Sequence, residues 1–338
     1  MNSRTADNGF TSLIDLAAER VGGKALSVSD DFFAEKENLL KPGRGIFIDD
    51  KYTDHGKWMD GWESRRKREE GHDWCVVKLG LRGIIHGVDI DTNHFLGNHP
   101  PHASIEAACV LGVPGDDDWV EILPKSHLDP GSQNLYEISS DKQWTHVKLH
   151  IYPDGGVARL KVYGEVIPDW NQFKNNEMTD LVAVQNGGRV VSCNDMFFSS
   201  KDNLIMPGRG INMGDGWETK RRRGLSYAAL GHDWVILKLA QPGIVNTIEV
   251  DTCHFKGNFP DQCSIESVFA PEAEDNELTD LSWQMMMDKE SLAADAQKHF
   301  ESELKIQTKI THLRFNIFPD GGISRLRING SFQFDSEK

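Results

Sequence analysis

Residues 71–106 decide the fold: GHDWCVVKLGLRGIIHGVDIDTNHFLGNHPPHASIE is followed 160 positions later, at 231–266, by GHDWVILKLAQPGIVNTIEVDTCHFKGNFPDQCSIE. The two stretches align without a gap and are identical at 18 of 36 positions. Each contains segments in which apolar and polar residues alternate, which is typical of β-strands with one buried face. A match of this length indicates that one domain is written twice in the chain.

Shorter motifs extend the duplication in both directions. Pro-Gly-Arg-Gly occurs at 42–45 and 207–210, Asp-Gly-Trp-Glu at 60–63 and 215–218, and Pro-Asp-Gly-Gly at 153–156 and 319–322. We therefore expect two domains, at residues 10–168 and 175–336, joined by a polar linker at 171–176. The first copy carries about ten additional residues around Asp50–Met59.

Each copy is predicted to be an antiparallel β-sandwich. Alternating segments at 146–151 and 312–317 run into Pro-Asp-Gly-Gly, which is a turn signal, and further alternating segments follow. Short strands separated by Gly, Pro and Asp turns favour a sandwich or jelly roll. Residues 278–303 have a helix-friendly composition, but they align with 119–137, which contains Pro124 and Pro130. We expect extended or irregular structure there, so the predicted fold class is all-β.

Composition excludes several classes of protein. The 338 residues include 52 acidic and 37 basic side chains, and the formal net charge of −15 argues against binding to nucleic acid or to anionic membranes. No apolar run approaches the roughly 18 residues that a membrane-spanning helix needs. Five cysteines without a Cys-x-x-Cys pair are typical of reduced thiols, which indicates a cytoplasmic protein.

Two arginine motifs are candidates for binding a small anion. In Gly-Arg-Gly, the flanking glycines permit close approach of a ligand, and guanidinium is suited to a carboxylate; a tight turn with a solvated arginine is the alternative. The basic run that follows Trp-Glu is either a local anion pocket or a solvated face. The candidates are Arg44 and Arg66 in the first copy and Arg209 and Arg221 in the second.

A histidine motif, Asp-Thr-x-His-Phe-x-Gly-Asn, follows an alternating segment in each copy. Histidine with a carboxylate three residues before it suits general acid–base chemistry, a metal site or a purely structural role. A third metal ligand at compact spacing is lacking, so we predict no metal and no cofactor, without excluding a divalent ion. The Gly-His-Asp-Trp histidines, His72 and His232, are expected to be structural. The acid–base candidates are Asp91 and His94 in the first copy and Asp251 and His254 in the second.

Taken in order, these doubled motifs resemble the allantoicase family over nearly the whole chain. The resemblance implies two tandem jelly-roll domains similar to galactose-binding modules, a homo-oligomer, and hydrolysis of allantoate to ureidoglycolate and urea. Allantoate carries a carboxylate and two ureido groups, so it needs an arginine clamp and groups that transfer protons. We add Glu63 and Glu218 as proton-transfer candidates and Asn98 and Asn258 as partners of a ureido carbonyl.

The competing hypothesis is a pair of carbohydrate-binding modules without catalysis. Sandwich domains often only bind ligands. Trp62 and Trp217 are suited to stacking on a sugar as much as to lining an enzyme pocket. The repeated His, Glu and Arg set favours the enzyme, because a sugar-binding site has little need of an acid–base pair.

Overall fold

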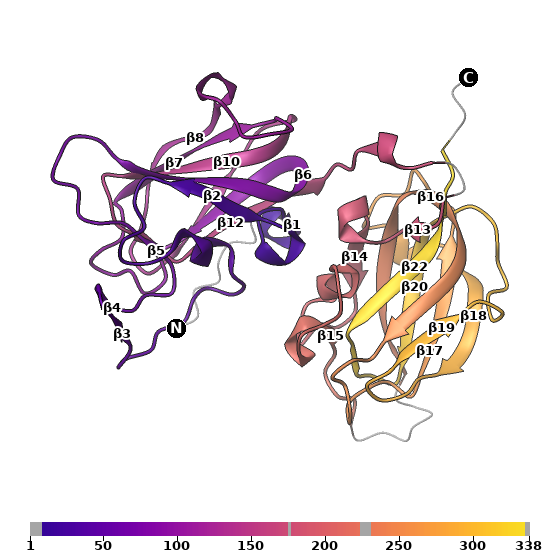
Figure 1. Cartoon of the computed structure of the whole chain (residues 1–338). Coiled ribbons are helices and arrows are strands. Elements are labelled where there is room, and N and C mark those ends of the chain that lie inside the picture. Colours follow the sequence, from indigo (N-terminus) through magenta and orange to yellow (C-terminus); the bar gives the residue numbers. More distant parts are fainter. Residues whose placement is uncertain (1–8, 175–176, 224–230, 335–338) are drawn as a thin grey trace. The chain divides into compact units, whose positions relative to one another are not determined.

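The computed structural model describes residues 9–174, 177–223 and 231–334. Its contacts divide the chain into two compact units, Met1–Ile167 and Pro168–Lys338, each of which is a separate sandwich in Figure 1. The described residues form strands and short 3₁₀ helices without an α-helix, which confirms the all-β prediction. The predicted limits of the second domain, residues 175 and 336, lie outside the described residues.

The first unit is built on one eight-stranded antiparallel sheet that folds into two layers. The order β1-β12-β6-β10-β7-β8 forms its main path, and β2 and β9 also pair with β6. Its strands are β1 (Ile14–Asp15), β2 (Lys24–Val28), β3 (Tyr52–Thr53), β4 (Gly56–Lys57), β5 (Trp62–Glu63), β6 (Asp73–Asp91), β7 (His102–Ala108), β8 (Val120–His127), β9 (Gln133–Glu137), β10 (Gln143–Tyr152), β11 (Gly156–Val157) and β12 (Arg159–Val166). The 3₁₀ helices are η1 (Gly9–Ser12), η2 (Glu19–Val21), η3 (Lys36–Leu40), η4 (Asp116–Asp118) and, after the unit ends, η5 (Trp170–Gln172).

The second unit repeats this pairing as β13-β22-β16-β20-β17-β18, with β14 and β19 on β16. Its strands are β13 (Thr179–Asp180), β14 (Arg189–Cys193), β15 (Trp217–Glu218), β16 (Asp233–Asp251), β17 (Gln262–Val268), β18 (Gln284–Ser291), β19 (Gln297–Phe300), β20 (Ile310–Phe318), β21 (Gly322–Ile323) and β22 (Arg325–Phe332). The 3₁₀ helices are η6 (Val184–Asn186), η7 (Lys201–Ile205), η8 (Met213–Asp215) and η10 (Leu278–Asp280).

A 19-residue strand connects the two layers of each unit. In the first unit, residues 75–78 of β6 pair with β2, whereas residues 87–91 pair with β9 and residues 83–91 with β12. β6 therefore begins in one layer and ends in the other. Val77, Ile85 and Ile90 of β6 are completely buried, and Leu149 and Leu160 from neighbouring strands join them in the core. The β6–β12 register shifts between Ile85 and Gly87, so residues of opposite parity point to the core on either side of this bulge.

Residues 278–303 and the additional residues of the first copy both form short strands. Residues 278–303 contain η10, β18 and β19, so the prediction of extended or irregular structure is confirmed. The prolines of the aligned segment, Pro124 and Pro130, correctly argued against a helix. The additional residues of the first copy form the β3–β4 hairpin. Among the described residues, no helix has the length and apolar character needed to cross a membrane.

Candidate functional site

A buried phenylalanine organises the loops at the end of β6. The ring of Phe95 lies against two glycines: a Cβ atom on Gly156 would be 2.0 Å from its Cδ1, and one on Gly61 would be 2.7 Å from its Cε2. These glycines belong to the Asp-Gly-Trp-Glu and Pro-Asp-Gly-Gly motifs, whose strands β5 and β11 pair with each other. Phe255 makes the same approach to Gly216 and Gly322 in the second unit. Absence of a side chain at these positions therefore brings three repeated motifs together.

A glutamate–asparagine pair lies where these motifs meet. Asn98 Nδ2 donates to Glu63 Oε1 at 2.7 Å, and the Asn98 carbonyl accepts the N–H of Gly156 at 2.8 Å. Burial raises the pKa of Glu63, and the hydrogen bond from Asn98 only partly offsets this effect. Asn258 donates to Glu218 in the second unit in the same way. Both units thus hold a half-buried carboxyl group in a fixed orientation.

An arginine of the basic run stands beside each pair. Arg221 donates to the carbonyl of Gly257, the residue before Asn258, at 3.3 Å, and its Nε lies 3.5 Å from Asp320. Arg66 is 3.8 Å from Asp154, the counterpart of Asp320, and three-quarters of its side chain is exposed. The next residue, Lys67, turns inward to the buried Asp73 at 2.7 Å. One member of the run therefore faces solvent beside the pair, and the next is structural.

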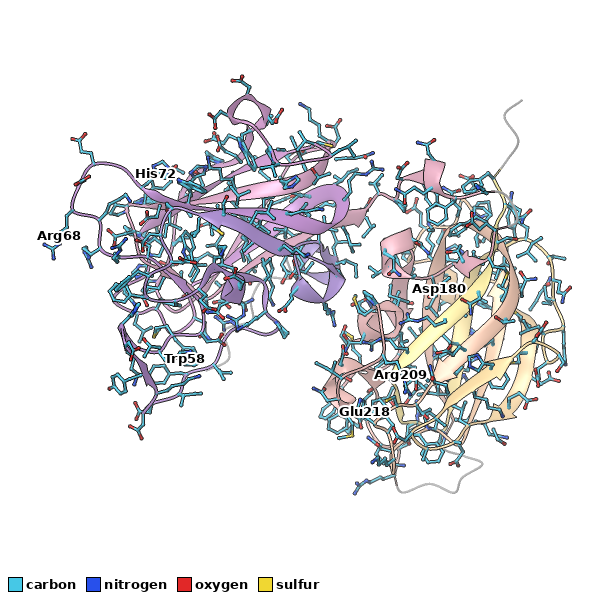
Figure 2. The ribbon with its side chains drawn as sticks, in the orientation of Figure 1. Trp58, Arg68, His72, Asp180, Arg209 and Glu218 are labelled. Atoms are coloured by element: carbon cyan, nitrogen blue, oxygen red, sulfur yellow. The ribbon has the colours of Figure 1, made fainter. Side chains whose placement is uncertain are left out.

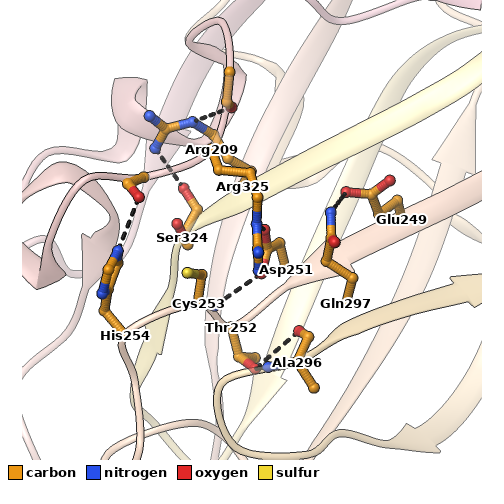
Figure 3. A network of polar contacts seen from close by, with 12 residues as sticks. Arg209, Glu249, Asp251, Thr252, Cys253, His254, Ala296, Gln297, Ser324 and Arg325 are labelled. Carbon is orange, nitrogen blue, oxygen red and sulfur yellow. Dashed lines mark hydrogen bonds and ion pairs between the residues drawn. The ribbon is translucent and has the colours of Figure 1, made fainter.

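The Gly-Arg-Gly arginines bind a buried aspartate of the histidine motif. Arg44 makes a bidentate contact with the fully buried Asp91, with Nε–Oδ2 at 2.7 Å and Nη2–Oδ1 at 3.0 Å. Arg209 and Asp251 repeat this contact at 2.8 and 3.0 Å (Figure 3). This differs from the prediction that the arginine forks clamp substrate while the aspartates orient the histidines. A buried carboxylate needs a permanent partner, and the fork supplies it.

The histidines of this motif have an uncommon backbone conformation. The φ angles of His94 and His254 are 68° and 71°, in the left-handed region that few non-glycine residues adopt. His94 stacks on Phe47 with ring centroids 5.6 Å apart, whereas His254 Nε2 bonds the carbonyl of Gly210 at 2.8 Å. In both copies the histidine side chain contacts a residue in or directly after the Gly-Arg-Gly loop.

The two predicted tryptophans are core residues. Trp62 and Trp217 have no exposed surface, and their indole N–H groups donate to the carbonyls of Asp30 and Asp195 at 2.8 Å. Neither ring offers a face to a ligand, so their assignment as substrate-binding residues is corrected to a structural role. The glutamate that follows each tryptophan points to the opposite side of its two-residue strand, as alternation requires.

Sequence reasoning missed a second ion pair at this end of the sandwich. Arg159, which is buried and lies opposite Asp91 in the β6–β12 register, donates to Asp60 Oδ2 at 2.8 Å and to its carbonyl at 2.9 Å. Although burial alone would raise the pKa of Asp60, the bonds from Arg159 and from a backbone N–H lower it. Arg325 and Asp215 form the same pair. In both copies the aspartate directly precedes Gly-Trp-Glu and the arginine follows Pro-Asp-Gly-Gly by three residues. This repetition could have predicted the ion pair.

The Gly-His-Asp-Trp histidines belong to hydrogen-bonded and stacked contacts of the sheet. His72 Nε2 lies 2.9 Å from His150 Nδ1, and His150 Nε2 lies 2.8 Å from Glu106. Burial lowers the pKa of both histidines. His232 packs on Phe318 in the second unit. These contacts agree with the predicted structural role of His72 and His232. Their partners, His150 and Phe318, lie on β10 and β20.

Figure 2 shows Arg209 and Glu218 at the same end of the second unit. Since the same contacts recur in the first unit, we treat the repeated motifs as one candidate site per unit. The described ranges contain no group of three His, Cys, Asp or Glu side chains arranged to hold a metal ion. Each site offers a half-buried carboxyl, an amide and an exposed guanidinium. This combination suits proton transfer on a small anion that also carries amide-like groups.

Comparisons with known proteins show which family the chain is similar to. The family described as Allantoicase repeat matches residues 14–167 and 179–333. The chain is 50% identical to probable allantoicase 1 of Burkholderia mallei over 94% of both chains, and 48% identical to allantoicase of Dictyostelium discoideum over 94% of this chain and 86% of that protein. A crystal structure of allantoicase from Saccharomyces cerevisiae is 34% identical, with a TM-score of 0.81 over 97% of this chain and 98% of the other. The chain belongs to the allantoicase family.

Proposed function

We propose that the protein hydrolyses allantoate to ureidoglycolate and urea at the candidate sites. The observation that carries this proposal is the hydrogen bond from Asn98 to the half-buried Glu63, with the exposed Arg66 three residues further along the chain, 3.8 Å from Asp154. The same three residue types stand together in the second unit. Their counterparts there are Glu218, Asn258 and Arg221.

The chemistry assigns a different part of allantoate to each side chain. The guanidinium of Arg66 binds the substrate carboxylate. The Asn98 amide, with one N–H on Glu63, presents its second N–H to a ureido carbonyl. Glu63 moves a proton: the bond between the central carbon and one ureido nitrogen breaks, and the oxygen of water bonds to that carbon. One water proton reaches the leaving nitrogen, which gives urea, and the other stays on the new hydroxyl group.

The remaining candidates support this arrangement. We assign Arg44 with Asp91, and Arg209 with Asp251, to holding the histidine motif in place, because each carboxylate already receives two guanidinium bonds. His94 and His254 stay candidates for the second proton transfer, since the strained backbone places them on the loop that also carries the asparagine. The sugar-binding alternative loses its main support because both tryptophans are buried.

Urea release from allantoate tests the proposal. We expect Glu63→Gln combined with Glu218→Gln to lower kcat by about 10²-fold or more, as removal of a proton-transfer group does. Glu272→Gln, the same change at an exposed carboxylate of the second unit, is the matched control and should leave kcat unchanged. Full turnover by the double variant would remove both glutamates from the mechanism, and absence of urea with the unaltered protein would refute the activity itself.

We also place the enzyme in the cytosol as a homo-oligomer. Cys75 and Cys263 are free thiols in the cores of the two units, as expected in a reducing compartment. Exposed aromatic side chains, among them Phe197 and Phe198 at 64% and 61%, are typical of surfaces that meet another copy. Light scattering tests the assembly, and a monomer at micromolar concentration would contradict it.

A further inference from the structure

The β3–β4 hairpin makes the two candidate sites unequal. It arises from the additional residues around Asp50–Met59, for which the second unit has only the short helix η8 in the corresponding place. Two strands of two residues each would be marginal alone, so contacts with the rest of the unit hold the hairpin in place. These contacts lead to the site.

The tip of the hairpin is attached to the segment beside Glu63. The ring of His55 stacks on Phe32 with centroids 4.1 Å apart and an angle of 22°, and its Nδ1 donates to the Phe32 carbonyl at 2.9 Å. The next residue, Phe33, donates its N–H to the carbonyl of Glu63, and Ala34 forms a β-bridge with Glu63. One residue therefore links the hairpin tip to the backbone that positions the candidate carboxyl group.

The base of the hairpin is attached to the arginine and histidine loops. The Lys57 ammonium lies 4.7 Å from the Phe47 ring centroid, and Phe47 in turn stacks on His94. Met59, which is 8% exposed, packs with Phe95 in the core cluster under the site. Trp58 donates its N–H to the Lys51 carbonyl and closes the hairpin. The hairpin thus contacts the segments that carry Glu63, His94 and Arg44.

The backbone contacts with the glutamate recur in the second unit, where Phe198 donates to the Glu218 carbonyl and Ser199 forms a β-bridge with Glu218. Among the described residues of that unit, no hairpin lies against this segment. Phe197 and Phe198, the counterparts of Phe32 and Phe33, are 64% and 61% exposed, against 44% and 37% in the first unit. Met213, in the short segment that replaces the hairpin, is 47% exposed. Its sulfur lies 3.9 Å from Asn258 Nδ2, so a flexible thioether stands at the second site.

We propose that the hairpin preorganises the first site, that the first unit therefore binds allantoate more tightly than the second, and that His55 is the positioning residue of this device. The inference rests on the proposed function, because it concerns the same sites. Preorganisation reduces the ordering that substrate binding requires, so it lowers KM more than it raises kcat. Loss of the His55 stack and hydrogen bond would free the hairpin tip without removing any group that contacts substrate.

Single-site enzymes test the proposal. Glu218→Gln inactivates the second site, so that only the first site remains active. Glu63→Gln inactivates the first site, so that only the second remains active. We expect KM for allantoate to be lower in the first of these variants. Adding His55→Ala to Glu218→Gln should raise KM about fivefold or more while kcat changes less than about twofold. His55→Phe keeps the ring stack and should restore most of the affinity, whereas His299→Ala, at an exposed histidine of the second unit, should have no effect.

The outcomes are distinguishable. An unchanged KM in the His55→Ala, Glu218→Gln enzyme overturns the role of the hairpin, and so does an equal rise in KM when His55→Ala is added to Glu63→Gln. Loss of all turnover in Glu218→Gln alone also overturns it, because the first site would then be inactive. Loss of all turnover in Glu63→Gln supports it. Absence of urea release with every protein, including the unaltered one, instead refutes the proposed function.

Discussion

The ring of Phe95 occupies the space that a side chain on Gly156 would need: a Cβ atom there would lie 2.0 Å from Cδ1 and from Cε1 of the ring. Gly156 is also the register partner of Glu63 in the β5–β11 pair. The packing of the Phe95 ring and the position of the Glu63 carboxyl group therefore both depend on Gly156. A change at either residue affects both.

Gly156→Ala should destabilise the first unit by about 1–3 kcal/mol, because the added methyl group forces the ring or the strand to move. Chemical denaturation measures the loss of unfolding free energy. Gly112→Ala is the matched control, since a Cβ atom there meets nothing within 4 Å, and it should be nearly neutral. Equal stability of the two variants would show that the Phe95 ring relaxes freely.

Arg44→Ala should cost about 3 kcal/mol, because it leaves the fully buried Asp91 carboxylate without its bidentate partner. The cost should fall when the same change is made in an Asp91→Asn background, and a double-mutant cycle measures the difference. Arg189→Ala removes a half-exposed pair with Asp275 and should cost less than about 1 kcal/mol. Similar costs for both arginines would contradict the role of burial.

Acid should destabilise the second unit through His312. Burial lowers the pKa of this histidine from 6.5 to about 4, so the unfolded chain binds a proton that the folded chain does not between these values. The contribution to stability is complete above pH 6.5 and is lost as the pH falls toward about 4, with a slope of at most about 1.4 kcal/mol per pH unit. His312→Gln should reduce this slope, as measured by denaturation at several pH values, and His299→Gln should not.

The pH dependence of the first site should follow Glu63. Asn98 donates the one bond that lowers the raised pKa of this carboxyl group, so Asn98→Ala should move the limb of the kcat/KM profile that Glu63 controls to higher pH. The direction is the same whether Glu63 acts as acid or as base. The measurement uses the Glu218→Gln background, and a profile that only drops in height would mean that Glu63 does not control the limb.

The doubled motifs were sufficient to predict the fold because strand alternation and turn chemistry are local. They also placed Glu63 and Asn98 among the candidates. The partner of Arg44 was not predictable from spacing, since Asp91 is 47 positions away and several acidic residues suited the same fork. Trp62 was misassigned because burial depends on the layer that covers a residue, which its neighbours in the sequence do not reveal.

The 19-residue strand β6 has a consequence for how a repeat comes apart. Since its first half is hydrogen-bonded in one layer and its second half in the other, neither layer retains its central strand if the other is lost. Each repeat should therefore open as one cooperative unit, and the slowest backbone amides to exchange with solvent deuterium should lie at both ends of β6 together. The end of the domain that carries the candidate site is therefore expected to exchange as slowly as the core.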